Sequence, residues 1–162
     1  MAVLAFLALV GTDAAQGTSN AVDELTLEQQ VGQLLVLSFS GTTPPAYVRE
    51  ALHEKRAAGV ILFGGNITGP SQLRELTRAL RAQGGRPIVA VDQEGGSIRR
   101  LQWAPPVRSA PEQLASGTVR VDSAAAARAL RSVGVTVSFA PVAEQAFGVN
   151  HRQRFQSEHE VS

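Results

Sequence analysis

The stretch Ile88-Val89-Ala90-Val91-Asp92-Gln93-Glu94-Gly95-Gly96 decides the fold. Its first four residues are apolar and mostly β-branched, which is typical of a strand buried on both faces, as in parallel sheets. Two carboxylates and a glycine pair follow this strand at once. Parallel α/β folds place their ligands at the carboxyl ends of their strands. The stretch therefore predicts an α/β protein with a binding site at this strand end.

The two carboxylates at the strand end, Asp92 and Glu94, are two residues apart. In strand geometry both would point to one side, roughly 6–7 Å apart, which is near the roughly 5–5.5 Å of a retaining glycosidase pair. The glycines favour a turn that swings Glu94 away, so we expect Asp92 alone to meet a ligand. The structural alternative is that both carboxylates cap backbone amides or pair with Arg99 and Arg100.

Length, composition and charge limit the possible classes of protein. A chain of 162 residues, 44% hydrophobic and 18% charged, is ordinary for one globular domain. Its 15 basic and 14 acidic residues give no charge argument for a nucleic acid or an anionic membrane as partner. The absence of cysteine excludes disulfides, thiolate metal sites and a cysteine nucleophile, but it leaves the compartment open. No metal cluster or cofactor is expected.

The N-terminal residues 1–24 are interpreted as a signal-like apolar segment followed by a small, polar linker. Residues 1–10 read MAVLAFLALV, which is similar to the apolar region of a secretory signal but too short to span a membrane. The first basic residue is Arg49, so the positively charged start of a signal peptide is missing. Export and a cytoplasmic location both stay open.

Apolar periodicity and turn residues predict alternating helices and strands. A first helix is expected to begin at the capping box Thr26-Leu27-Glu28-Gln29. A second is expected to begin at Pro44-Pro45 and to end at Gly59, and a third to begin at Pro70-Ser71. A fourth is expected to run over residues 122–133. The expected strands are 36–39, 60–63, 88–91 and 135–139, and residues 103–111 are expected to form a proline-broken loop. This order predicts parallel βαβ units with right-handed crossovers. Residues 143–162 show no sustained periodicity and are expected to be a disordered tail.

Three motifs occur in an order found in one known family: Gly59-Val60-Ile61-Leu62-Phe63 with Asn66-Ile67, the 92–96 stretch with Arg100-Leu101, and Phe139-Ala140-Pro141-Val142. Over residues 25–142 the chain resembles the N-terminal domain of glycoside hydrolase family 3, nearest the bacterial β-N-acetylhexosaminidases. The resemblance implies a TIM (β/α)8 barrel. Because a barrel typically takes about 250 residues, we expect a partial barrel of about the first four βα units.

The resemblance also implies a role for Asp92, which matches an aspartate that hydrogen-bonds hydroxyls of the sugar ring in the subsite preceding the cleaved bond. An ionised carboxylate at a strand end suits this role because it can accept two O–H donors in strong, charge-assisted bonds. Glu94, Gly95, Gly96 and Arg100 are expected to form the supporting loop. Ser97 and Gly65 stand where the family commonly has arginine, so the local electrostatics are expected to be softer.

No catalytic residue is assigned. The family's nucleophilic aspartate and its histidine-aspartate acid/base pair match nothing in this chain. His151 and His159 lie in the tail without the family's Lys-His-Phe-Pro-Gly-His setting, and His53 is expected on a helix surface. We therefore expect a truncated chain, from a frameshift or a premature stop in a longer gene, that is inactive alone.

Three functions remain open. The first is the N-terminal part of a retaining, exo-acting glycosidase in carbohydrate or cell-wall sugar metabolism, with a β-linked N-acetylglucosaminide or related glycoside as substrate. The alternative is a non-catalytic sugar-binding half-barrel, or one that self-associates through its open sheet edges to complete eight strands. The third is a small doubly wound domain of the flavodoxin type, but Gly64-Gly65-Asn66 and Gly95-Gly96 lack the spacing of a phosphate-binding loop.

Overall fold

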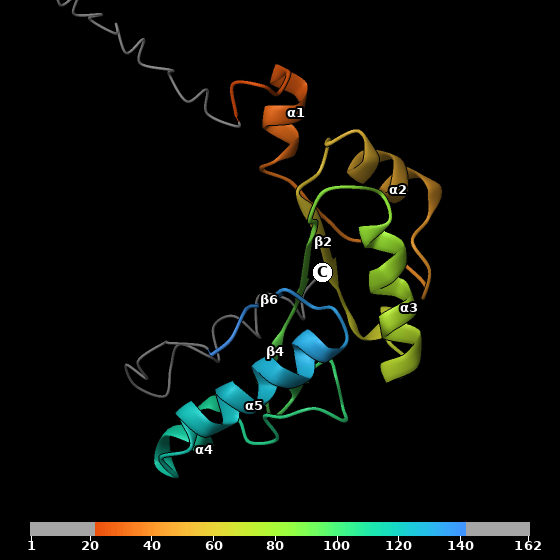
Figure 1. Ribbon diagram of the computed structural model, residues 1–162. Coiled ribbons are helices and arrows are strands. Elements are labelled where there is room, and N and C mark those ends of the chain that lie inside the picture. Colours follow the sequence, from red (N-terminus) through yellow and green to blue (C-terminus); the bar gives the residue numbers. More distant parts are fainter. Residues whose placement is uncertain (1–21, 142–162) are drawn as a thin grey trace, which may run out of the picture.

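The computed structural model describes residues 22–141, which form an α/β unit (Figure 1). Its strands are β1 (Val36–Leu37), β2 (Gly59–Leu62), β3 (Ile88–Val91), β4 (Gln93–Gly95), β5 (Ile98–Arg99) and β6 (Val137–Ser138). Its helices are α1 (Leu27–Gly32), α2 (Ala46–His53), the 3-10 turn η1 (Gly64–Asn66), α3 (Pro70–Arg81), α4 (Ala110–Ala115) and α5 (Val119–Ser132). The signal-like segment and the expected tail, with His151 and His159, lie outside the described residues.

The main sheet has four parallel strands in the order β1-β2-β3-β6, which is also their order in the chain. The longest ladder joins β2 to β3, from Gly59 opposite Ile88 to Leu62 opposite Val91. The predicted parallel βαβ units are therefore confirmed. A doubly wound sheet reverses its strand order at a switch point, and the described strands contain no such reversal, so the flavodoxin-type alternative is wrong.

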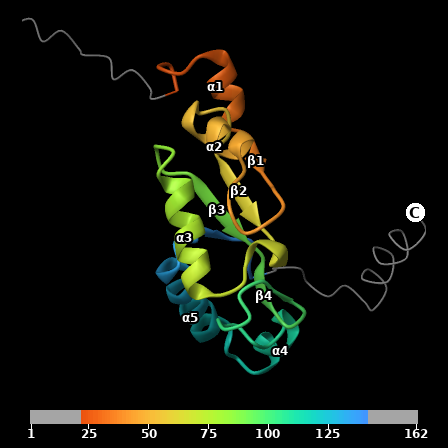
Figure 2. The ribbon, with the colours of Figure 1, turned by 90° about the vertical axis from the view of Figure 1, so that its right-hand side faces the viewer.

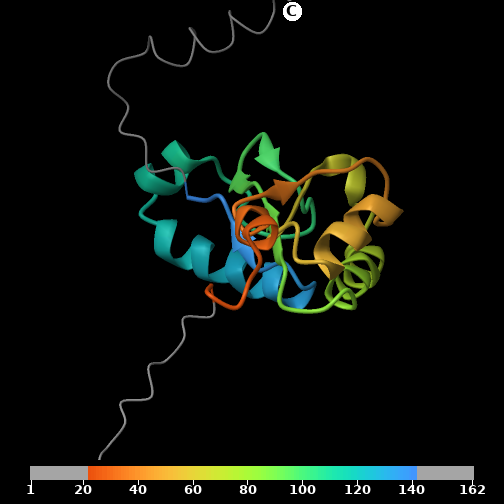
Figure 3. The same cartoon turned by 90° about the horizontal axis from the view of Figure 1, so that it is seen from above.

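Helices α3 and α5 lie on one face of the sheet beside β2 and β3, as Figures 2 and 3 show. In a strand, residues two apart share a face, and four valine and leucine side chains of β2 and β3 point into the core this way. They pack against α2, α3 and α5 in a cluster that includes Val60, Leu62, Val89, Val91, Val48, Leu52, Leu73, Leu76, Leu80 and Leu130. This packing fixes the carboxyl ends of the strands, where the candidate site lies.

Local sequence signals placed most of the elements, and α1 shows why. Thr26 Oγ1 accepts a hydrogen bond from Gln29 N at 3.2 Å, and Gln29 Oε1 accepts one from Thr26 N at 3.1 Å. These two bonds are the predicted capping box, which satisfies two donors at the helix start.

Several boundaries differ from the sequence-based expectations. Gly59 does not end α2, which stops at His53; it is the first residue of β2. The first and fourth strands are shorter than the expected 36–39 and 135–139, and α5 begins at Val119 rather than at residue 122. The expected loop over 103–111 gives way to α4 at Ala110. None of the helices in the described part of the chain is long and apolar enough to cross a membrane.

Candidate functional site

The candidate site lies where β3 ends at Val91. Burial alternates over the next residues, because Gln93 and Gly95 are buried while Asp92 and Glu94 are only partly so. The chain then folds back in an antiparallel hairpin of β4 and β5, with Gln93 opposite Arg99. Asp92 and Glu94 thus share the less buried side of this segment, and the glycines turn the chain after Glu94 rather than before it.

The hairpin returns Arg100 to the side of Asp92. Arg100 Nη2 lies 3.4 Å from Asp92 Oδ2, and Arg100 N donates to the Asp92 backbone carbonyl at 3.4 Å. Both side chains are about one quarter exposed, at 27% for Arg100 and 21% for Asp92. This contact is longer than the roughly 2.7–2.9 Å of a tight charge-assisted bond. The carboxylate is thus oriented by one arginine and still reachable from solvent.

The glycine pair after Glu94 is required by backbone conformation and by space. Gly95 has φ +99° and Gly96 has φ +59°, which side chains with a Cβ rarely adopt. A Cβ on Gly95 would lie 2.0 Å from the Arg108 carbonyl oxygen, and one on Gly96 would lie 2.9 Å from Ser109 Cβ. The hairpin can therefore pack against the 108–109 backbone only with glycine at both positions.

Gln93 stabilises the hairpin from its buried side by hydrogen bonds. The sequence analysis did not predict this role. Its side chain is 1% exposed. Nε2 lies 3.1 Å from the Leu101 carbonyl, 3.2 Å from that of Ala104 and 3.1 Å from that of Pro105, and Oε1 accepts from Leu101 N at 2.9 Å. Gln93 thus holds residues 101–105, which directly follow Arg100, in place.

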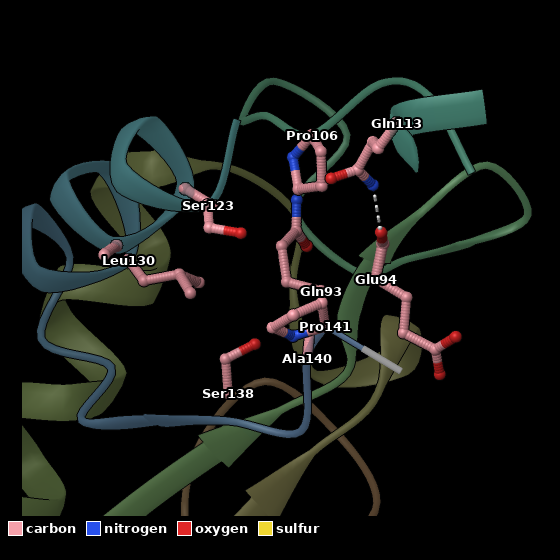
Figure 4. Close-up of a pocket in the computed structure, with 11 residues that line it drawn as sticks. Gln93, Glu94, Pro106, Gln113, Ser123, Leu130, Ser138, Ala140 and Pro141 are labelled. Atoms are coloured by element: carbon pink, nitrogen blue, oxygen red, sulfur yellow. Dashed lines mark hydrogen bonds between the residues drawn. The ribbon is translucent and has the colours of Figure 1, made fainter. Parts of the chain in front are cut away.

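A second buried amide, Gln113 of α4, holds the other side of the hairpin. Its Nε2 donates to the Glu94 carbonyl at 3.0 Å and to the Arg108 carbonyl at 2.8 Å. Figure 4 shows the first of these bonds, with the Glu94 carboxylate directed away from Gln113. The small pocket drawn there, of about 90 Å³, is mainly lined by apolar groups such as Leu130 and Pro141. The backbone carbonyl of Glu94 is therefore tied to α4 through Gln113.

A larger groove lies at the same edge of the sheet, beyond the ends of β1 and β2. Its volume is about 460 Å³, and it is lined by Ser38, Phe39, Ser40, Gly41, Tyr47, Phe63, Gly65 and Asn66. Arg100 lies between this groove and Asp92. Its guanidinium carbon lies 5.7 Å from the centre of the Phe63 ring, and its Nη2 lies 3.4 Å from Asp92 Oδ2. Asn66 holds its floor with donor bonds to the carbonyls of Phe39 and Gly41, at 2.9 and 2.7 Å.

Other candidate chemistry is sparse in this part of the chain. Within residues 22–141 no three His, Cys, Asp or Glu side chains are grouped so that they could hold a metal ion. His53 is exposed on α2 with its Nδ1 3.3 Å from the Gln83 carbonyl, so the expected surface histidine is confirmed.

Comparison with known proteins decides the family. Residues 26–158 match the Glycosyl hydrolase family 3 N terminal domain. The chain belongs to this family. The family 3 chain is 36% identical over 122 residues to a β-hexosaminidase of Xanthomonas oryzae pv. oryzae, covering 68% of itself and 36% of that relative. It is 37% identical over 119 residues to a β-hexosaminidase of Nitrosomonas eutropha, covering 67% of itself and 34% of that relative.

Solved structures agree with this assignment of the family 3 chain. A family 3 β-N-acetylglucosaminidase from Paenibacillus sp. str. FPU-7 superposes with a TM-score of 0.66 at 28% identity, over 72% of this chain and 24% of that one. A β-N-acetylhexosaminidase from Beutenbergia cavernae gives a TM-score of 0.63 at 28% identity, over 73% of this chain and 38% of that one. The family 3 chain therefore spans about a third of the length of the curated relatives it matches.

Proposed function

We propose that this chain is the sugar-binding N-terminal part of a retaining, β-N-acetylhexosaminidase-like glycoside hydrolase. The single observation that carries the proposal is Asp92, a partly exposed carboxylate at the carboxyl end of a parallel strand, oriented by Arg100 at 3.4 Å. Such a carboxylate can accept hydrogen bonds from two sugar hydroxyls. The chain's relatives, named as β-hexosaminidases, support a β-linked N-acetylhexosaminide as the ligand.

The architecture we propose is about the first four βα units of a TIM barrel, over residues 25–142, and the family match extends beyond this range to residue 158. The strands of the sheet lie in the same order as in the chain, and helices lie on one face. A TIM barrel wall has this arrangement, which supports the proposed partial barrel. The TM-scores of 0.66 and 0.63 to family 3 enzymes also support it. In the complete enzyme, the nucleophile and the acid/base group would come from outside the residues matched here.

Sugar binding and sugar cleavage can be tested separately. We expect the purified 162-residue chain to bind methyl β-N-acetylglucosaminide, seen as shifts of the amide signals of residues 92–100 in an NMR titration. Replacing Asp92 with alanine should abolish these shifts. Replacing Glu75, an exposed residue of α3, with alanine is the matched control and should leave them unchanged. Binding that survives the Asp92→Ala change would contradict the assignment of this carboxylate.

The same preparation should release no chromophore from an aryl N-acetylglucosaminide, because no residue of the chain matches the family's nucleophile. Clear turnover that disappears in Asp92→Ala would overturn this part of the proposal. It would also revive Asp92 and Glu94 as a two-carboxylate site, since the two share one side of the strand segment.

A second candidate function, a self-assembling half-barrel, is favoured by the two edges that stay unpaired in the described part of the sheet. Val36 of β1 is 41% exposed, and Phe139, which follows β6, is 54% exposed. Two copies that paired these edges would complete eight strands. Light scattering of the purified chain distinguishes the functions, because a monodisperse dimer supports the half-barrel and a monomer rejects it.

A further inference from the structure

We propose that the groove beyond β1 and β2 is a second sugar subsite, which holds the ring adjoining the one bound by Asp92 in a β-linked oligosaccharide. This inference rests on the proposed function of Asp92 as a sugar ligand. Because the proposed enzyme acts from the end of its substrate, the groove would receive the sugar on the leaving-group side of the cleaved bond. The groove's volume of about 460 Å³ lies within the roughly 300–1,000 Å³ of small-molecule sites.

Two exposed aromatic rings give the groove a surface suited to sugars. Phe63 is 41% exposed and Tyr47 is 55% exposed, although both are large apolar side chains. The face of an aromatic ring carries partial negative charge, which attracts the weakly positive C–H groups on the flat side of a pyranose. Tyr47 is also held in place, since its hydroxyl donates to the Ser38 carbonyl at 3.2 Å.

The polar groups around these rings fit a neutral, hydroxyl-rich ligand. The groove contains the exposed hydroxyls of Ser38 and Ser40 and no charged side chain. Gly65 adds no side chain to the groove lining, and a Cβ added there would meet no heavy atom within 4 Å. Small-molecule sites combine apolar walls with a few polar groups in this way. Arg100, which lies over the Phe63 ring, carries a charge that is paired with Asp92.

The groove and Asp92 form one continuous surface at the carboxyl edge of the sheet. Arg100 contacts both, through its 3.4 Å pair with Asp92 and its position 5.7 Å above the Phe63 ring. The lining segments follow β1 and β2, and Asp92 follows β3, so neighbouring parallel strands present the two subsites side by side. A sugar chain that enters at Asp92 therefore meets the aromatic rings next.

The test compares one sugar ring with two in the full 162-residue chain. The probes are methyl β-N-acetylglucosaminide and N,N′-diacetylchitobiose, titrated into isotope-labelled protein and followed by amide NMR signals. We expect the disaccharide to bind about three- to tenfold more tightly, as one added aromatic contact allows. Only the disaccharide should shift signals of residues 38–41, 47 and 63–66.

Substitutions in the groove should remove the preference for the disaccharide. Tyr47→Leu removes an aromatic ring and Gly65→Leu adds a bulky side chain to the groove lining, so both should bring the disaccharide to the affinity of the monosaccharide. Tyr47→Phe keeps the ring and loses only the hydroxyl, so it should keep the preference. Gly69→Leu is the control for Gly65→Leu, because a Cβ at Gly69 also meets open space and Gly69 does not line the groove.

Three results would overturn the subsite. If the monosaccharide binds at Asp92 and the disaccharide binds no more tightly, the groove is not a subsite while the proposed function stands. If neither sugar binds, both proposals fail. If the groove signals broaden with protein concentration and ignore both sugars, the groove is an interface with a second copy of the chain.

Discussion

At the scale of single residues, neighbouring side chains at the end of β3 do different work. Asp92 faces the partly exposed side and pairs with Arg100, while Gln93 faces the interior and makes four hydrogen bonds to backbone groups of Leu101, Ala104 and Pro105. An amide is suited to this because it donates and accepts at once. The position of Arg100 beside Asp92 therefore depends on Gln93.

Replacing Gln93 with leucine should destabilise the chain by about 2–4 kcal/mol, because it leaves a buried N–H and several buried carbonyls without partners. The free energy of unfolding in urea, followed by circular dichroism, measures this loss. Gln102→Leu is the matched control, because Gln102 lies in the same loop but is exposed, and it should cost little. Equal losses in the two variants would show that Gln93 does not fasten the loop.

Glu112 predicts a pH dependence at the start of α4. The pKa of Glu112 lies below its ordinary 4.5, mainly because the Ser109 hydroxyl donates to its carboxylate, and also because of the Ser109 backbone N–H and nearby Arg108. A carboxyl pKa that is lower in the folded state adds stability above the unfolded pKa, and this stability is lost as pH falls through the folded pKa.

Glu112→Gln should therefore be less stable than the unchanged chain at pH 7, and the difference should shrink as the pH falls below 4.5 and the carboxyl becomes protonated, first in the unfolded and then in the folded state. Thermal unfolding at several pH values measures the difference. Glu75→Gln changes an exposed glutamate of α3 and serves as control. A difference between Glu112→Gln and the unchanged chain that stays the same as the pH is lowered would contradict this account.

The residue scale also shows what local patterns can and cannot reveal. The carboxylate at a strand end and the glycine pair after it are local signals, and both were recognised in the sequence. The roles of Gln93 and Gln113 were not recognised, because the residues next to a glutamine do not indicate which distant backbone groups its amide will bond. Tyr47 and Phe63 are separated by 16 positions in the sequence, and only the folded chain brings them into one groove.

At the scale of elements, the regular strands and helices were predictable because their apolar spacing matches their burial. The exceptions have physical causes. Gly59 resembles a helix-ending glycine, but it lies inside the sheet, where a Cβ would sit 2.1 Å from the Ile88 carbonyl oxygen. The prolines of 103–111 suggested only a loop, yet Pro111 lies in the first turn of α4, where proline needs no partner for its nitrogen.

Gly59→Ala should therefore destabilise the chain by about 2–3 kcal/mol, since the added methyl group forces β2 away from β3. The urea midpoint of unfolding measures the change. Gly64→Ala is the control, because a Cβ there meets no heavy atom within 4 Å and its φ lies outside the left-handed region, so it should change the midpoint little. If Gly59→Ala proves as stable as Gly64→Ala, the Ile88 backbone does not exclude a side chain at position 59.

At the scale of the whole molecule, the described sheet ends in two open edges that carry apolar side chains. Leu34 is 82% exposed and Leu35 47% exposed just before β1, and Phe139 is 54% exposed after β6. Unpaired strand edges with apolar neighbours promote association of chains. In the proposed complete barrel, further strands would cover both edges.

Val36→Lys should reduce self-association of the chain, because it places a charge on the open edge of β1. The weight-average mass from light scattering over a range of protein concentrations measures this. Val107→Lys is the matched control, since Val107 is 69% exposed but lies in the loop before α4. An equal effect of both changes would mean that added charge alone, and not the edge, limits association.

The strand order also has a consequence for the synthesis of the chain. Val36 of β1 pairs with Gly59, Gly59 with Ile88, and Ala90 with Val137, so each strand joins a neighbour that has already left the ribosome. Assembly can thus proceed from the N-terminus without waiting for a later strand. The largest loop closes when β6 docks, and closing a longer loop costs more entropy. Ribosome-bound chains that end before residue 137 should already hold the β1-β2-β3 sheet.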